Sequence, residues 1–385
     1  MENALSEKTY FKYRDEVVHL IESPELINHL EKRYECKAFQ LNNKIYPVTV
    51  LWKNDNEYIH PDAILGQFDK SEPHPLEKSP LFEPEEYKNA RSFIKEEFEK
   101  GPIKYEGIHY SMQGIDISTN PAKINGAYCL YYDNILTQYA MEWELKKALK
   151  NLKLNTIDLL FNPDILPLRE ALEEKIKNPI FNGKGRSAAL SISTLLVFKK
   201  DDGKFWFILH KRSSEVGVSP KMQHVVPSGM FEAKDLTAQW SIETNIWREL
   251  LEELYNKKEF QGSGKQETQE NIKYKKPIKL LREMIVEGSA ELCVTGICSD
   301  LLSMRPEICT IIFVKDSSFA SAKKMKTNWE IETDIYDKVA KPYDLINETI
   351  EDFSTKGNIA VTAPVCIQLG RNWIAQRHGI GSKKQ

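Results

Sequence analysis

Short apolar blocks separated by polar turns run through the second half of the chain and predict a mixture of strands and helices. Residues 201–203 (Asp-Asp-Gly) form a tight-turn signal between two such blocks, which predicts two adjacent strands. Four blocks predict strands and a longer apolar segment predicts a closing helix: 190–198, 205–210, 292–297 and 308–314 for the strands, and about 361–375 for the helix.

The first half shows the same kinds of pattern without any spacing typical of a catalytic motif. An apolar stripe predicts a helix within residues 7–34, and alternation around Asn42-Asn43 predicts a pair of strands over residues 38–52. Further along we expect a long loop over residues 66–84 and a polar helix over 85–100. A strand-rich region follows at 105–132, then a strong helix at 135–152 and a connecting segment at 163–179.

The run from Arg248 to Glu253 (Arg-Glu-Leu-Leu-Glu-Glu) is the most informative polar pattern. As a helix it places Glu249, Glu252 and Glu253 at i, i+3 and i+4, on one side and one turn apart. Like charges this close repel one another unless a positive group lies among them. Arg248 is one candidate for that group, a divalent cation is another, and a solvated helix face is the alternative. The remaining positions are apolar and predict a helix anchored in a core: Trp240, Ile246, Trp247, Leu250, Leu251 and Leu254.

Strand-like sequence and a turn at Pro227-Ser228-Gly229 precede this helix. With a strand, a glycine turn and a carboxylate helix in that order, the chain resembles the Nudix hydrolase family. The signature of that family joins a glycine turn to a helix carrying Arg-Glu-x-x-Glu-Glu. Gly229 and Arg248 through Glu253 match those parts, and the resemblance covers about residues 186–378. It implies an α/β fold with a Nudix-like α/β/α sandwich and a mixed sheet in the C-terminal half. The patterns of the first half predict an α+β N-terminal domain before it.

Two positions depart from the family pattern. Trp240 stands eight positions before the arginine, where the family has a glutamate, and Tyr255 stands where it has a glycine. The stretch between the turn and the helix is also longer than usual. Glu232 and Glu243 are nearby carboxylates that substitute for the missing glutamate or serve only as structural or solvated groups.

The resemblance implies that Glu249, Glu252 and Glu253 bind Mg²⁺ or Mn²⁺, the hard cations that carboxylate oxygens suit. It gives Arg248 the task of bracing a glutamate from behind. The family often takes its catalytic base from a loop outside the signature. Glu307, at the entrance to an apolar strand, is a candidate for that base or an ordinary strand-end carboxylate.

Substrate contacts are expected from basic residues around the same turn. Arg212 and His210 end a predicted strand, and Arg212 has the geometry to bind phosphate oxygens in pairs. His224 is either a phosphate donor or a buried strand histidine. Arg305 pairs with a phosphate or with Glu307, and the glycine turn at Gly229 completes the expected substrate-binding set.

The length of 385 residues predicts two domains. We place an α+β domain at 1–180 and the Nudix-like domain at 186–385, with a polar insertion at about 256–277. A formal charge of -3 gives no basic surplus, so nucleic acid is not the expected partner.

No apolar run is long enough for a bilayer, no secretory core is present, and the six cysteines lack metal spacing. We therefore expect a cytoplasmic protein with reduced cysteines, a nucleotide-type small molecule as its partner and no membrane. A homodimer is one oligomeric state left open.

Two functions from different classes follow. The first is a metal-dependent hydrolase of a pyrophosphate bond in a nucleoside diphosphate linked to another moiety, of the ADP-ribose or nucleotide-sugar type. The second is a catalytically weak or inactive Nudix-fold sensor that binds such a nucleotide while its N-terminal domain engages a partner. Trp240 in place of a glutamate favours the sensor, and retention of the three clustered carboxylates favours the hydrolase.

Overall fold

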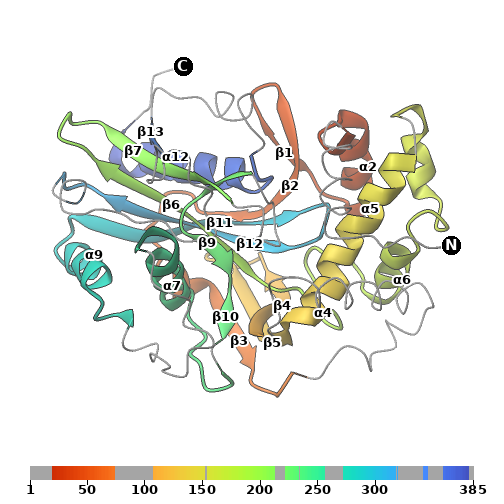
Figure 1. The fold of residues 1–385 in the computed structure, drawn as a ribbon, viewed down its shortest axis with the longest axis horizontal. Coiled ribbons are helices and arrows are strands. Elements are labelled where there is room, and N and C mark those ends of the chain that lie inside the picture. The colour runs from red at the N-terminus through yellow and green to blue at the C-terminus, as the bar shows by residue number, and fades with distance from the viewer. Residues whose placement is uncertain are drawn as a thin grey trace.

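The chain is of mixed α/β class, with two sheets and helices packed against them (Figure 1). The computed structural model describes the following parts of the chain, to which all structural statements refer: residues 20–73, 107–151, 154–212, 222–233, 235–255, 272–317, 319, 341–345 and 359–380.

The larger sheet has nine strands within this described part. Seven follow one another in the order β1 (Ala38–Leu41), β2 (Lys44–Lys53), β11 (Ala290–Asp300), β12 (Pro306–Val314), β6 (Ser191–Lys199), β7 (Phe205–Lys211) and β13 (Lys341–Asp344). β8 (Gln223–Val225) pairs with β7, and β9 (Ser228–Met230) pairs with β6. β12 and β6 run parallel and the other neighbours run antiparallel, so the sheet is mixed.

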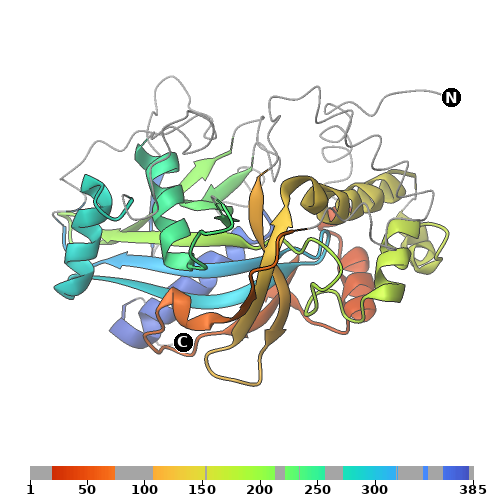
Figure 2. The ribbon, with the colours of Figure 1, turned by 90° about the horizontal axis from the view of Figure 1, so that it is seen from below.

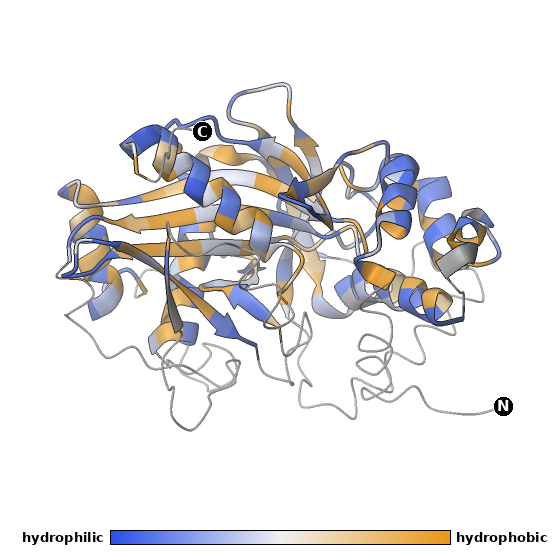
Figure 3. Cartoon of the chain, turned by 90° about the horizontal axis from the view of Figure 1, so that it is seen from above, coloured by the Kyte–Doolittle hydropathy of each residue, from blue (hydrophilic) through white to orange (hydrophobic). Residues whose placement is uncertain are grey.

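Helices cover both faces of this sheet. α7 (Ile242–Tyr255) and α9 (Lys276–Val286) lie on one face, and α12 (Ala363–His378) lies on the other (Figures 1 and 2). β11 and β12 are buried along their whole length because both of their faces are covered. Figure 3 shows the apolar residues concentrated along these central strands. Gly370 lets α12 approach closely, because a Cβ there would lie 2.6 Å from Leu195.

The smaller sheet crosses the end of the larger one. Its order is β10 (Glu232–Ala233), β4 (Ile108–Asp116), β5 (Lys123–Leu130) and β3 (Leu65–Asp69). β4 pairs antiparallel with β10, which follows β9 after a single residue, Phe231. The chain thus passes from the larger sheet into the smaller one at Phe231, within the segment that carries the glycine turn.

The remaining helices form a second cluster beside the β11–β12 end of the sheet. It contains α2 (Pro24–Tyr34), α5 (Ala140–Asn151), the 3-10 segment η5 (Leu154–Phe161) and α6 (Pro167–Lys175). A four-residue helix, α4 (Tyr131–Asn134), and a π-helical segment, η4 (Ile135–Tyr139), lead into α5. The buried Arg169 donates to the carbonyl of Leu302, in the loop between β11 and β12, and fixes the cluster to the sheet.

The boundary expected at residues 180–186 does not divide the larger sheet. β2, from the first half, pairs with β11 through Ile297 opposite Trp52 and Cys298 opposite Val50. The main apolar core likewise combines first-half residues such as Val48 and Tyr110 with the second-half strands. One core therefore joins segments from both halves, while the four helical segments form a separate core with residues 301–304.

Most predicted elements are confirmed. β6, β7, β11, β12 and α12 match the expected strands and closing helix within a few residues, and β1 and β2 match the expected strand pair. Two expectations are wrong: β3 extends into the first residues of the supposed loop 66–84, and α6 lies within the supposed connection 163–179. Residues 85–100 and most of the supposed insertion 256–277 lie outside the described residues; the insertion's end is the start of α9.

No helix in the described part is long and apolar enough to span a bilayer. The six cysteines are all free, and five of them are buried, as expected for small apolar side chains.

A fragment of residues 186–385 tests whether the halves share a core. It leaves β11 without β2 and uncovers the apolar face that the smaller sheet packs against, so we expect it to aggregate and to show no cooperative unfolding in urea. Full-length protein should unfold cooperatively under the same conditions. A fragment with native-like circular dichroism and a sharp transition would contradict the shared core.

Candidate functional site

The glycine turn lies directly beneath the carboxylates of α7. β9 places Ser228 opposite Ser193 and Gly229 opposite Ile192 in the sheet. A Cβ on Gly229 would lie 2.0 Å from Oε1 of Glu249, well inside any allowed contact. Glycine is required here because the Glu249 carboxylate packs on the turn.

The three carboxylates of α7 are all buried. Glu249, Glu252 and Glu253 are 5, 6 and 0% exposed, which excludes a solvated helix face. The backbone N–H of Ser228 donates to Oε2 of Glu253 over 2.8 Å, which fixes the innermost carboxylate to the turn. Apolar residues of the same helix pack into the core: Ile246, Trp247, Leu250, Leu251 and Leu254.

Arg248 neutralises two of these carboxylates. Its guanidinium donates to Oε1 of Glu249 at 2.5 Å and to Oε2 of Glu252 at 3.0 Å. It also donates to the carbonyl of Met230 at 2.9 Å, which ties the helix to the glycine turn. Arg248 therefore contacts two of the three glutamates and the glycine turn at once.

Glu232 supplies a further carboxylate to Arg248. Its Oε2 lies 3.6 Å from the guanidinium, and its Oε1 lies 3.4 Å from Nε2 of His109 on β4. Burial alone would raise the pKa of Glu232, but Arg248 and the hydrogen bond with His109 lower it to about 2. Of the two glutamates considered as substitutes, Glu232 is therefore the one that contacts the arginine.

Trp240 is a packing residue. Its ring stacks on Phe231 with centroids 4.9 Å apart and contacts the rings of Phe68 and Tyr110 at the same separation. Gly126 makes room for it, because a Cβ there would lie 2.8 Å from the indole. The second departure, Tyr255, ends α7 and packs against the same core.

Glu307 and Arg305 reach the same edge of the sheet from β12 and the residues before it. Ser193 donates a hydrogen bond to Oε1 of Glu307, and Arg305 lies 3.6 Å from its Oε2. Nε2 of His224 lies 3.9 Å from Oε1 of Glu307. Glu307 is therefore a buried, paired carboxylate at the site, although it lies more than 100 residues from Ser193 in sequence.

Two buried histidines lie near the carboxylates of Glu307 and Glu253. His210 on β7 stands opposite His224 on β8, and Nε2 of His210 lies 3.9 Å from Oε1 of Glu253. Burial, with Arg212 and His224 nearby, lowers the pKa of His210 well below its ordinary value. Burial also lowers the pKa of His224 to about 4, against the opposing effect of Glu307.

Arg212 and Arg305 are two basic residues whose charges act on Tyr139, a residue of the first half of the chain. Arg212 donates to the hydroxyl of Ser228 over 3.3 Å, so it reaches the glycine turn. Burial raises the pKa of Tyr139 to about 12, and the charges of Arg305 and Arg212 act against that rise. The charges of both arginines therefore act on the Tyr139 hydroxyl.

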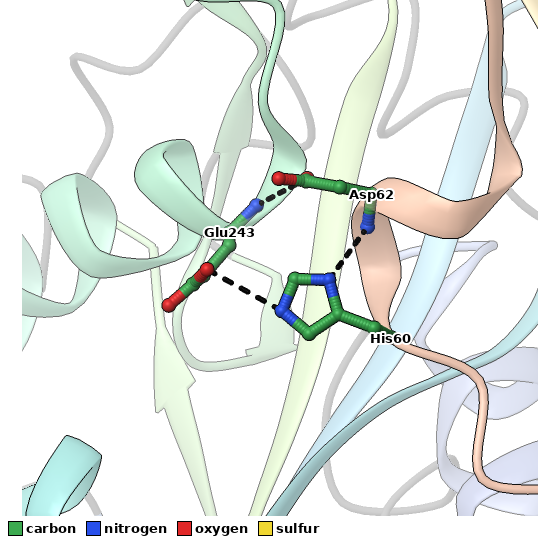
Figure 4. A group of neighbouring side chains, drawn as sticks. All are labelled: His60, Asp62 and Glu243. Atoms are coloured by element: carbon green, nitrogen blue, oxygen red, sulfur yellow. Dashed lines mark hydrogen bonds and ion pairs between the residues drawn. The ribbon is translucent and has the colours of Figure 1, made fainter.

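A different trio has the closest ligand atoms in the described part of the chain. His60, Asp62 and Glu243 hold one ligand atom each within 4.8 Å of the others (Figure 4). These atoms already bond to one another and to α7: Asp62 accepts from the backbone N–H of Glu243 (3.0 Å) and from Ser241 (2.7 Å), and His60 lies 3.3 Å from Glu243. The trio anchors the start of α7, where an acidic side chain is favourable.

The donor set around the glycine turn suits a divalent cation. It offers three buried carboxylates, with a glycine where any side chain would displace one of them. Glu249, Glu252 and Glu253 are the residues that could hold the ion, and the buried His210 lies beside them.

All the site residues expected from sequence lie at this edge of the sheet, but the sequence did not identify four further ones: Ser193, Ser228, His109 and Tyr139. Ser193 stands on a predicted strand and Ser228 in the predicted glycine turn, and only the sheet register brings the two serines together at the site. No local pattern distinguished His109 or Tyr139, because their roles depend on contacts with distant segments. No family model matches the chain. A search of curated proteins also finds no match.

Gly229→Ala tests the packing of Glu249 on the turn. The added methyl must displace a buried carboxylate held by Arg248, so we expect a loss of about 1–3 kcal/mol in the free energy of unfolding. Gly114→Ala is the matched control, because its Cβ would meet nothing closer than 3.9 Å. Equal urea midpoints for the two variants would contradict the packing.

Glu232→Gln tests the pair with Arg248. We expect it to lower the free energy of unfolding by about 2 kcal/mol at pH 7, because the amide loses the ionic attraction. Since the folded-state pKa of about 2 lies below the ordinary 4.5, this stability is present above pH 4.5 and is lost as the pH falls through 2. The difference between wild type and variant should shrink over that window.

The control for this measurement is Glu283→Gln on α9, whose pair with Lys279 is solvent-exposed. We expect a change of less than about 0.5 kcal/mol at any pH. Urea unfolding of the three proteins from pH 7 to pH 2 gives the comparison. A pH-independent difference for Glu232→Gln would show that its carboxylate is not ionically paired.

Proposed function

We propose that this chain is a metal-dependent hydrolase of the Nudix type. Its substrate would be a pyrophosphate bond in a nucleoside diphosphate linked to another moiety, such as ADP-ribose or a nucleotide sugar. The layers α7 with α9, the mixed sheet and α12 would then correspond to the family's α/β/α sandwich.

One observation carries the proposal. The carboxylates of Glu249, Glu252 and Glu253 are buried around a glycine turn, and Glu307, Arg305 and Arg212 converge on the same edge from separate strands and loops. Burying so many charges is costly, and groups of buried charged side chains are concentrated at sites that bind charged ligands or carry out chemistry.

Glu249, Glu252 and Glu253 would hold Mg²⁺ or Mn²⁺. When bound, the cation would offset phosphate charge and lower the pKa of a coordinated water. Ser228 orients Glu253 through its backbone N–H, and Arg248 holds Glu249 and Glu252 in place through hydrogen bonds.

Glu307 would take the proton of the attacking water. Ser193 and Arg305 each contact one of its carboxylate oxygens and would orient the group. His224, at 3.9 Å, adds a neutral polar neighbour, because its lowered pKa keeps it uncharged near pH 7.

The phosphate groups would be bound by Arg212 and Arg305. Arg212 donates to Ser228 on the glycine turn and Arg305 pairs with Glu307, so both guanidinium groups belong to the contacts around the candidate site. The turn at Gly229 contacts both Arg212 and the helix carboxylates, and its backbone would approach the bridging oxygen of the diphosphate. His210 and His224 would border the same space from β7 and β8.

A ligand sensor of the same fold is the second candidate, and one observation favours it. Arg248 already neutralises Glu249 and Glu252 without a cation, so the carboxylate cluster does not require an ion to be stable. Such a protein would bind the nucleotide through Arg212 and Arg305 without cleaving it.

Glu253→Gln tests the hydrolase. We expect wild type to cleave a member of a panel of ADP-ribose, NAD, dinucleoside polyphosphates, nucleotide sugars and nucleoside triphosphates with Mg²⁺ or Mn²⁺. The variant should lose at least about a hundredfold in turnover, because it removes the innermost negative oxygen. Chromatographic detection of the nucleoside monophosphate product measures the loss.

The matched control is Glu243→Gln on the same helix. Its carboxylate belongs to the trio with His60 and Asp62, so we expect turnover close to wild type. Loss of turnover in Glu243→Gln but not in Glu253→Gln would move the metal site to that trio. A panel in which no compound is cleaved but one raises the melting temperature would favour the sensor.

A further inference from the structure

His210 is a buried polar side chain whose ring nitrogens make no hydrogen bond within the described residues. It is 2% exposed, and in the described part of the chain neither ring nitrogen has a hydrogen-bond partner. Buried polar atoms in folded proteins nearly always have partners, and an exception calls for an unseen ligand or a chemical role. The position of His210, in the centre of the candidate site, makes the exception informative.

The nearest acidic group is the Glu253 carboxylate. Nε2 of His210 lies 3.9 Å from Oε1 of Glu253, and both side chains are fully shielded from solvent. This separation is too long for a hydrogen bond. A first-row divalent ion binds imidazole nitrogen and carboxylate oxygen at about 2.1 Å each, so two ligands of one ion lie at most about 4.2 Å apart. The separation of 3.9 Å between the two atoms lies within that limit.

His224, the cross-strand neighbour of His210, is in a different position. Its Nδ1 lies 3.2 Å from the carbonyl of Val225, and its Nε2 lies 3.4 Å from the hydroxyl of Thr362. The two histidines share strand pairing and burial, yet only His210 lacks partners. His224 is therefore a matched control for His210.

We propose that His210 is a nitrogen ligand of the cation held by Glu253, and that the site takes a first-row transition ion such as Mn²⁺ in preference to Mg²⁺. Imidazole nitrogen binds such ions, whereas Mg²⁺ is held mainly by oxygen ligands and water. The remaining coordination positions belong to carboxylate oxygens, water and substrate phosphates. This inference rests on the cation site of the proposed function and adds a ligand and a selectivity to it.

Pulsed electron paramagnetic resonance of the full-length protein loaded with Mn²⁺ alone tests the ligand. We expect modulation from a directly bound ¹⁴N nucleus in wild type and in His224→Gln, and none in His210→Gln. His210→Gln should also weaken Mn²⁺ binding about tenfold or more in calorimetry while leaving Mg²⁺ binding nearly unchanged. Glu253→Gln should weaken binding of both ions, which places the bound Mn²⁺ at this site.

Labelling all histidines of the wild-type protein with ¹⁵N gives the same test without a substitution. If a histidine nitrogen binds the Mn²⁺, the ¹⁴N modulation should be replaced by coupling to ¹⁵N. Bound Mn²⁺ without nitrogen coupling in wild type, or coupling that survives in His210→Gln, would overturn the inference and leave the carboxylate site intact. Wild-type protein that binds no Mn²⁺ and no Mg²⁺ would overturn the cation site of the proposed function as well.

Discussion

Repulsion among the buried carboxylates of α7 is the constraint around which the site is built. Glu249, Glu252 and Glu253 lie within two turns of one helix and have little contact with solvent. Arg248 offsets two of them, and the backbone N–H of Ser228 donates to the third. The close approach of Gly229 follows from the same need, because the turn must come near enough to stabilise the charges.

The first half of the chain supports this helix from two directions. Asp62 accepts from the first turn of α7, and His109 contacts Glu232, which in turn faces Arg248. Both contacts need the smaller sheet and the segment at residues 60–64 to be packed against the larger sheet. The carboxylate helix is consequently oriented by residues that lie far from it in sequence, and the halves act as one structural unit at the site.

The sequence predicted α7, its buried face and the strands around it because these depend on local periodicity. It placed Glu307, Arg305 and Arg212 near the helix only through resemblance to a family pattern. The insertion of β2 beside β11, and the contacts of His109, depend on pairing between distant segments, which no local pattern encodes. For the same reason the boundary at residues 180–186, expected from chain length and from the extent of the family resemblance, does not separate the strands of the larger sheet.

Trp240 stands where the pattern of the family that the chain resembles has a glutamate. In the structure, Glu232, on the strand after the turn, places its carboxylate near the guanidinium of Arg248. The indole is then free to fill the space between Phe231, Phe68 and Tyr110, which joins the smaller sheet to the loop before α7. A glutamate at residue 240 would be buried among aromatic rings without its charge partner, so in this fold tryptophan is the stable residue there.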